Sequence, residues 1–245
     1  MLYFLDDRLD PARMKHIQLF KTAILASICL LGLATAATGA WATYRELQPQ
    51  ELGSTALDRV LAMRDGTELS AFSIASQNNA LLDCTNALGA TQSLAMMYGG
   101  TEARRQIAPK CLALADHVAR QTPSNAFAWY VGAEASAALQ YWDGLNRRLA
   151  LSWRTGPTEQ WVGELRVALA EDNYQHLDDQ VIAANDADLH MLVRSARGVR
   201  AIAARYVTDP GFRERITAIV ETMPTENQAR FLANVRRFAV TRAQS

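Results

Sequence analysis

The sequence predicts an all-α protein in which one N-terminal transmembrane helix precedes a set of antiparallel helical hairpins. The prediction rests on an uncharged apolar run near the N-terminus, two similar proline–tryptophan stretches, and helical spacing of apolar residues towards the C-terminus. Only 13 glycines and 7 prolines occur among the 245 residues, which favours helices. The equal numbers of basic and acidic residues, 25 of each, argue against bulk attraction to nucleic acid.

The membrane helix is predicted over the 23 residues Thr22–Tyr44, which contain no charged side chain. At about 1.5 Å per residue they span roughly 35 Å, enough to cross a hydrocarbon core of about 30 Å. Trp41 and Tyr44 lie near the far end, where amphipathic rings prefer the membrane interface. Four basic residues precede the run, namely Arg8, Arg13, Lys15 and Lys21.

This charge asymmetry predicts that the N-terminus is cytoplasmic and that the rest of the chain is periplasmic, because basic residues favour the cytoplasmic side. The predicted division is a cytoplasmic segment (1–21), the anchor (22–44), a tether (45–53) and a periplasmic helical domain (54–245) with a repeat-like core (101–172) and basic C-terminal helices (186–242). The location expected is therefore the bacterial inner membrane, with a single pass.

A cleavable signal peptide is the main alternative for the apolar run. Its strongly apolar part, 23–34, is only 12 residues long, and small residues that suit cleavage follow it. Against cleavage, the 21 residues ahead of the run are long for a signal peptide and contain Asp6, Asp7 and Asp10. Both alternatives export the rest of the chain, whereas a buried core helix is disfavoured by the length of the uncharged run.

Two cysteines, Cys84 and Cys111, lie in the exported region, while Cys29 lies within the apolar run and is assigned no role. An even number of cysteines in an oxidising compartment favours a disulfide. Two separately buried thiols are the alternative. No histidine or acidic cluster adjoins either cysteine, so a metal site is not expected.

The hairpins are predicted from the stretches "TPSNAFAWY" (122–130) and "TGPTEQW" (155–161). Their prolines, Pro123 and Pro157, are 34 residues apart, and a tryptophan follows each proline. A helix–turn–helix unit of about 34 residues with this arrangement is the tetratricopeptide pattern. Trp161 follows its proline by four residues rather than six, and only about one and a half repeats are legible, so an irregular helical bundle is the alternative.

Further helices are predicted on both sides of this core. Ser54 is expected to cap a short helix over 55–64, and a longer helix is expected over 70–97. Apolar residues recur at helical spacing throughout 186–207, which predicts one continuous helix there. Two later helix starts are predicted from the pairs Asp209–Pro210 and Thr225–Gln228.

No catalytic, cofactor-binding or metal site is predicted. The four histidines are scattered, and there is no phosphate-binding loop, nucleophile elbow or dinucleotide fingerprint. Glu159 and Glu164 could suggest a carboxylate pair for sugar hydrolysis, but their spacing places them on different helix faces. An envelope enzyme is therefore the least favoured hypothesis, and convergence of Glu164, Glu171 and His176 in one pocket would support it.

Two groups of side chains are candidates for binding a partner. Aromatic rings could stack on sugars or hold a peptide, or could pack between helices; these are Trp129, Tyr130, Trp142, Trp153 and Trp161. Arginines are the second group, because ten of them accompany four acidic residues over 194–242. Arg194, Arg197 and Arg205 are expected on one helix face, where they could dock an acidic protein, an anionic polysaccharide or lipid head groups, or could simply be solvated.

The repeat-like stretch, together with "GPTEQWVGELRVALAE" (156–171) and "RGVRAIAARYV" (197–207), carries a resemblance to a known group of proteins. The chain resembles small membrane-anchored, tetratricopeptide-like proteins of α-proteobacteria, most specifically over 111–171. The resemblance implies an accessory role in cell-surface polysaccharide assembly and brings no catalytic residues. The leading hypothesis is therefore a periplasmic scaffold that binds an envelope protein and needs no cofactor. A glycan-binding module that uses aromatic rings and arginines is the second hypothesis.

Overall fold

The computed structural model describes residues 11–51, 53–63, 73–98 and 100–243. Every regular element in these ranges is helical, which confirms the all-α prediction. The acidic residues expected before the apolar run and the predicted helix start at Ser70 lie outside the described residues. The chain divides into two compact units, Met1–Gln48 and Pro49–Ser245.

The described part of the first unit belongs to α1 (Pro11–Glu51), a continuous helix of 41 residues that includes the predicted anchor, runs three residues past Gln48 and continues through most of the expected tether. Its stretch Met14–Leu47 is long and apolar enough to cross a membrane, with a mean hydropathy of 1.9 over its most apolar window. Polar atoms within this stretch are satisfied locally, since Ser27 and Thr38 donate to carbonyls four residues back at 2.8 and 3.0 Å. Such internal pairing is what a hydrocarbon environment requires.

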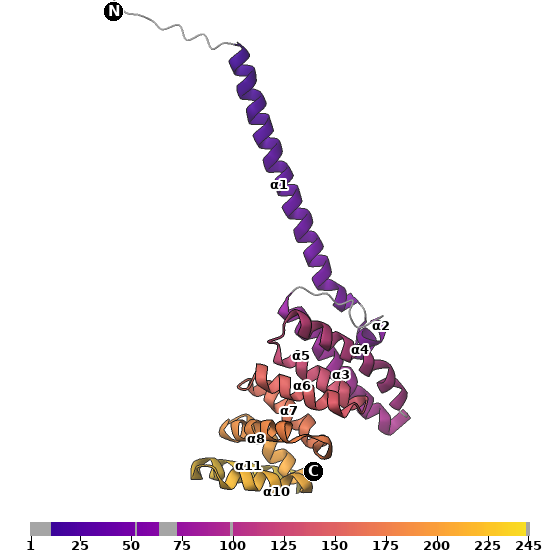
Figure 1. Cartoon of the computed structure of the whole chain (residues 1–245), viewed down its shortest axis with the longest axis vertical. Coiled ribbons are helices and arrows are strands. Elements are labelled where there is room, and N and C mark those ends of the chain that lie inside the picture. Colours follow the sequence, from indigo (N-terminus) through magenta and orange to yellow (C-terminus); the bar gives the residue numbers. More distant parts are fainter. Residues whose placement is uncertain (1–10, 52, 64–72, 99, 244–245) are drawn as a thin grey trace, which may run out of the picture. The chain divides into compact units, whose positions relative to one another are not determined.

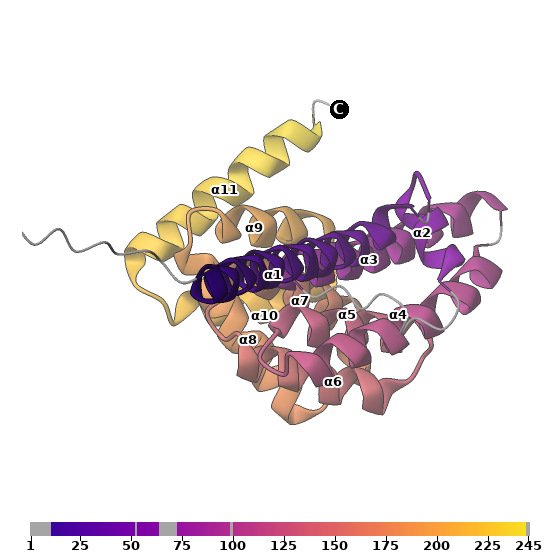
Figure 2. The same cartoon turned by 90° about the horizontal axis from the view of Figure 1, so that it is seen from above.

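The second unit is a stack of helices, which Figure 1 shows in successive layers and Figure 2 shows from above. Its elements are α2 (Ala56–Ala62), α3 (Ile74–Tyr98), α4 (Thr101–Gln121), α5 (Ala126–Ala138), α6 (Trp142–Thr155), α7 (Gln160–Asp172), η1 (Tyr174–His176), α8 (Asp179–Arg194), α9 (Gly198–Thr208), α10 (Pro210–Glu221) and α11 (Thr225–Ala243). From α3 to α6 each helix packs on the next, and alternate helices also touch, α3 with α5, α5 with α7 and α6 with α8. The pattern brings α3, α5 and α7 side by side.

Side-chain caps explain where several of these helices begin. The Thr55 hydroxyl accepts from the Asp58 backbone while the Asp58 carboxylate accepts from the Thr55 backbone, so α2 has a capping box and its cap is Thr55 rather than Ser54. The Asn125 side chain accepts two backbone N–H groups at the start of α5. Asp209 caps α10 with a proline at the first helical position, as predicted.

The prediction of a single helix over 186–207 is wrong, because the helix is interrupted between α8 and α9. Ser195 adopts an extended conformation, and its hydroxyl accepts from the Gly198 backbone at 3.0 Å. A Cβ atom at Gly198 would lie 2.8 Å from the Leu192 carbonyl oxygen, so this approach requires glycine. Helical spacing persists across the break because both helices bury their apolar residues in the same core.

The start of α11 also differs from the prediction. The helix begins at Thr225 itself, and the Gln228 side chain does not return to that residue's backbone. Instead it donates to the Met223 carbonyl at 2.9 Å and the Glu221 carbonyl at 3.2 Å. Gln228 therefore satisfies carbonyls at the end of α10 rather than forming a capping box.

A disulfide joins Cys84 of α3 to Cys111 of α4, with a Cα–Cα distance of 5.5 Å. Both cysteines are fully buried within the core shared by α2, α3, α4 and α5. The disulfide prediction is thus confirmed over the alternative of two separate thiols. The bond fixes α3 against α4 at the first described hairpin of the stack, whereas Cys29 is free and exposed on α1.

Two buried arginine–aspartate pairs fasten further helices together. Arg148 of α6 donates to Asp116 of α4 at 2.8 Å, and Arg166 of α7 donates to both oxygens of Asp188 in α8 at 2.7 and 2.8 Å. Gly132 leaves room for the first pair, since a Cβ there would lie 2.8 Å from the Arg148 side chain. Because such charges are costly when unpaired, the pairs specify which helices lie against each other.

Candidate functional site

A cavity of about 410 Å³ opens on the surface where α3, α5 and α7 lie side by side. Each helix contributes residues of one face; on α7 these include Leu165, Ala168 and Asp172, which are spaced three or four apart. We call this surface the α3–α5–α7 groove. Its other lining residues include Thr85, Leu88, Arg104, Glu134 and Leu169. The walls therefore combine aliphatic side chains with polar and charged ones, which also include Tyr130 and Asn173.

Glu134 is the distinctive polar group of the groove and the single charged residue of α5. Burial raises its pKa from 4.5 to about 7, and the nearby hydroxyls of Thr85 and Tyr130 oppose that rise. Its Oε2 atom and the Thr85 hydroxyl are buried without a hydrogen-bond partner among the described residues. A carboxyl group with these properties is free to bind a hydrogen-bond donor.

Two of the aromatic candidates, Trp129 and Tyr130, support the groove from within. Tyr130 is 4% exposed, and burial first and the Glu134 charge second raise its pKa well above 10. The phenol therefore stays protonated at physiological pH. Trp129 packs against the same core, and its ring N–H donates to the Pro123 carbonyl at 2.9 Å, which holds the turn that precedes α5.

The remaining aromatic candidates lie at separate positions. Trp142 stacks on His176 with ring centres 3.8 Å apart, which holds the segment after α7 against α6. Trp153 is half-buried in α6. Trp161 at the start of α7 is 44% exposed and touches the Phe127 ring at 4.8 Å. The five rings thus do not form one exposed platform.

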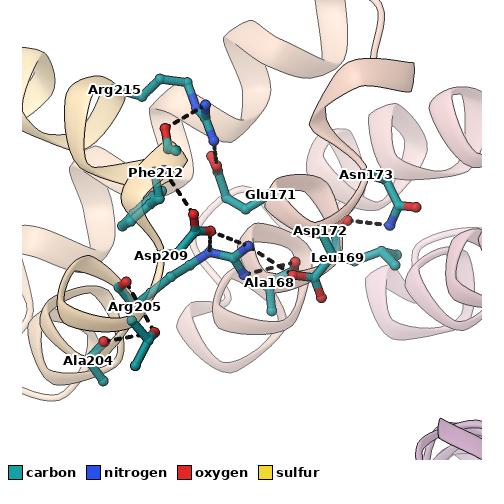
Figure 3. A network of polar contacts seen from close by, with 12 residues as sticks. Ala168, Leu169, Glu171, Asp172, Asn173, Ala204, Arg205, Asp209, Phe212 and Arg215 are labelled. Atoms are coloured by element: carbon teal, nitrogen blue, oxygen red, sulfur yellow. Dashed lines mark hydrogen bonds and ion pairs between the residues drawn. The ribbon is translucent and has the colours of Figure 1, made fainter.

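An ion-pair network borders the groove at the end of α7 (Figure 3). Asp172, which lines the cavity, accepts from Arg205 at 2.8 Å, and Arg205 also pairs with Asp209 at 3.0 Å. Beside them, the buried carboxylate of Glu171 pairs with Arg215. These contacts tie α7 to α9 and α10 and hold Asp172 in place at the cavity.

The three candidate arginines do not share one helix face, contrary to the prediction, because α8 ends before α9 begins. Arg194 ends α8, where its carbonyl accepts from Arg230 at 2.9 Å. Arg197 precedes α9, is exposed and lies 3.6 Å from Glu164. Arg205 is half-buried in the network just described. The three arginines thus make separate contacts and come from two helices and the segment between them.

The acidic and histidine side chains that could have suggested an enzyme are engaged separately. Glu164 accepts from Gln160 at 2.9 Å, Glu171 pairs with Arg215, and His176 lies against the Trp142 ring. In the part of the chain that the structure describes, no three metal-ligating side chains meet.

Sequence reasoning missed Glu134, although a signal was present. A lone acidic residue inside an otherwise uncharged helical run, "AFAWYVGAEASAA" (126–138), cannot be assigned to a solvated face. No protein-family model matches the sequence, and neither a curated protein nor a solved structure is detectably similar to it.

Proposed function

We propose that the protein is a single-pass, membrane-anchored periplasmic scaffold that binds a segment of an envelope protein in the α3–α5–α7 groove. The observation that carries the proposal is the cavity of about 410 Å³ on that face. Its volume lies within the range of about 300–1,000 Å³ that is usual for binding pockets. The resemblance noted in the sequence adds surface-polysaccharide assembly as the setting.

Two features support export. α1 is long and apolar enough to span a membrane, and basic residues are more frequent before its apolar run than directly after it. The Cys84–Cys111 disulfide belongs to the second unit, and stable disulfides are typical of oxidising compartments such as the periplasm. These features together support the proposal of a cytoplasmic N-terminus and a periplasmic second unit.

The proposed architecture of the second unit is a tetratricopeptide-like stack. Repeat stacks of this kind use the helices at alternate positions to build an extended binding surface. The contacts of α3 with α5 and of α5 with α7 agree with such an arrangement, as does the tryptophan near the start of both α5 and α7. The irregular end at α9–α11 would then cap the stack.

Site-specific photocrosslinking in the native envelope tests the binding function. A photoreactive residue with a small diazirine side chain, short enough to leave the groove open, replaces Ala168, which is exposed and lines the groove, and in a matched strain it replaces Ala187, an exposed residue of α8 outside the groove lining. We expect an adduct with one envelope protein from position 168 and none from position 187. Recovery of only the uncrosslinked chain from position 168 would contradict the proposal.

The location has an independent test. A membrane-impermeant maleimide applied to intact spheroplasts should label Ala187→Cys, which places a thiol at an exposed position of α8, without cell lysis. The intact mass of the purified chain distinguishes an uncleaved anchor from a removed signal peptide. Labelling that required lysis would place the second unit in the cytoplasm and refute export.

A further inference from the structure

Within the mixed lining of the groove, one acidic group lies beside aliphatic side chains. Glu134 lies among Leu88, Leu165 and Leu169, which line the same cavity. Two buried oxygens there, Glu134 Oε2 and Thr85 Oγ1, have no hydrogen-bond partner among the described residues. Unpaired buried oxygens are uncommon in folded proteins, and both of these can accept a hydrogen bond from a bound donor.

We infer that the groove receives a lysine or arginine side chain of the partner polypeptide, whose aliphatic stem packs on the leucines and whose charged end binds Glu134. The inference rests on the proposed function. Lysine and arginine combine an apolar stem with a head group that only donates hydrogen bonds, three from an ammonium and five from a guanidinium. An acidic side chain would be repelled by the charge of Glu134. A purely apolar side chain would leave the Glu134 and Thr85 oxygens without a hydrogen-bond donor.

Exposed apolar side chains near the cavity favour a polypeptide over a free amine. Leu82 on α3 is 47% exposed and Trp161 on α7 is 44% exposed. Leu82 precedes Thr85 by three residues and Trp161 precedes Leu165 by four, so each shares a helix face with a cavity residue. A chain segment that inserts a basic side chain would also cover these two residues, whereas a small amine would leave them in water.

Arg104 from α4 and Asp172 from α7 are the other charged residues at the cavity. Asp172 is shared with Arg205, so its charge is largely compensated. The Arg104 guanidinium suits a carbonyl oxygen of the bound backbone and disfavours a second cation. The groove is therefore specific for one basic side chain in a segment, rather than for a polybasic stretch.

Peptide display against the full-length protein in lipid nanodiscs tests the inference at pH 8. A random heptapeptide library is selected on the wild-type chain, and the recovered peptides are measured by fluorescence anisotropy. We expect one lysine or arginine at a fixed position, and a loss of affinity of at least tenfold when norleucine replaces it. Glu134→Gln should cause a similar loss, whereas the matched control Glu226→Gln, at an exposed site on α11, should change affinity less than twofold.

Ala168→Trp, which fills the groove, separates the failure of this inference from that of the proposed function. Peptides that Ala168→Trp blocks but that show no basic preference, or that ignore Glu134→Gln, overturn the inference and leave groove binding intact. Selected peptides that Ala168→Trp does not affect, or no selected peptides at all, overturn both. Competition by n-butylguanidinium as effective as that of the best peptide would identify a free cation as the ligand and overturn the polypeptide assignment.

Discussion

The ionisation of Glu134 should make the stability of the second unit depend on pH in a way that Glu134→Gln removes. The folded pKa of this carboxyl is about 7 and its ordinary value is 4.5. At pH values below 4.5 the group is protonated in both states. As the pH rises from 4.5 to 7 the unfolded chain releases the proton first, so stability is lost across this window and the loss is complete above pH 7.

The size of the loss follows from the two pKa values. One pKa unit corresponds to about 1.4 kcal/mol, so the rise from 4.5 to about 7 is worth about 3 kcal/mol. The free energy of unfolding of Glu134→Gln minus that of the wild type should therefore be about 3 kcal/mol larger at pH 8 than at pH 4. Glutamine has nearly the same size and shape as glutamate, so the fold should be retained.

Urea denaturation of the full-length protein in detergent micelles, followed by tryptophan fluorescence, measures this difference. Subtraction of the two proteins at each pH cancels the titration of every other group. The matched control Glu226→Gln alters an exposed acid that pairs with Arg230, and it should change the free energy of unfolding by less than about 1 kcal/mol at either pH. A difference between Glu134→Gln and the wild type that stays constant from pH 4 to pH 8 would refute the assignment of a raised pKa.

Three further predictions concern the helix stack, and the same denaturation assay measures each. Replacement of Cys84 and Cys111 by alanine opens a loop of 27 residues and should lower the free energy of unfolding by about 3.5 kcal/mol; a change below about 1 kcal/mol would mean that the bond is not formed. Asp188→Asn strands the buried Arg166 charge and should cost about 3–5 kcal/mol, whereas a cost like that of a surface substitution would contradict the pairing. Gln140→Gly relieves a residue with φ of 57° and should stabilise by about 0.5–1 kcal/mol, and a loss of stability would argue against that backbone geometry.

The helices of the repeat-like core could be predicted because local chemistry determines their ends. Asn125 caps α5 with its own side chain, and a proline precedes it where α4 must stop. Proline cannot supply the backbone donor that a helix interior needs, so its effect is independent of tertiary contacts. The break at Ser195 was missed because it has no such signal: a serine hydroxyl and a close approach at Gly198 end α8, while the apolar spacing continues.

The candidate site was harder to predict because burial of a charged residue is decided by contacts between distant segments. Arg205 lies on a helix position that the pattern marks as polar, yet Asp172, 33 residues earlier, draws it into the network beside the cavity. Glu134 becomes buried only when α3 and α7 pack on either side of α5. The spacing of apolar residues describes one helix at a time, so it predicts neither the Arg205–Asp172 pair nor the packing of α3 and α7 on α5.

The raised pKa of Glu134 also limits how strongly the groove can select a cation. A partner cation that stabilised the ionised carboxyl enough to return its pKa from about 7 to 4.5 would bind up to about 300-fold more tightly than an uncharged side chain of the same shape. The incoming ammonium or guanidinium also leaves water, which removes part of that gain. A preference between tenfold and a hundredfold at pH 8 is therefore expected, and it should decline below pH 7, where the carboxyl must first release its proton. The charge that destabilises the free protein is thus the one that a basic partner would stabilise.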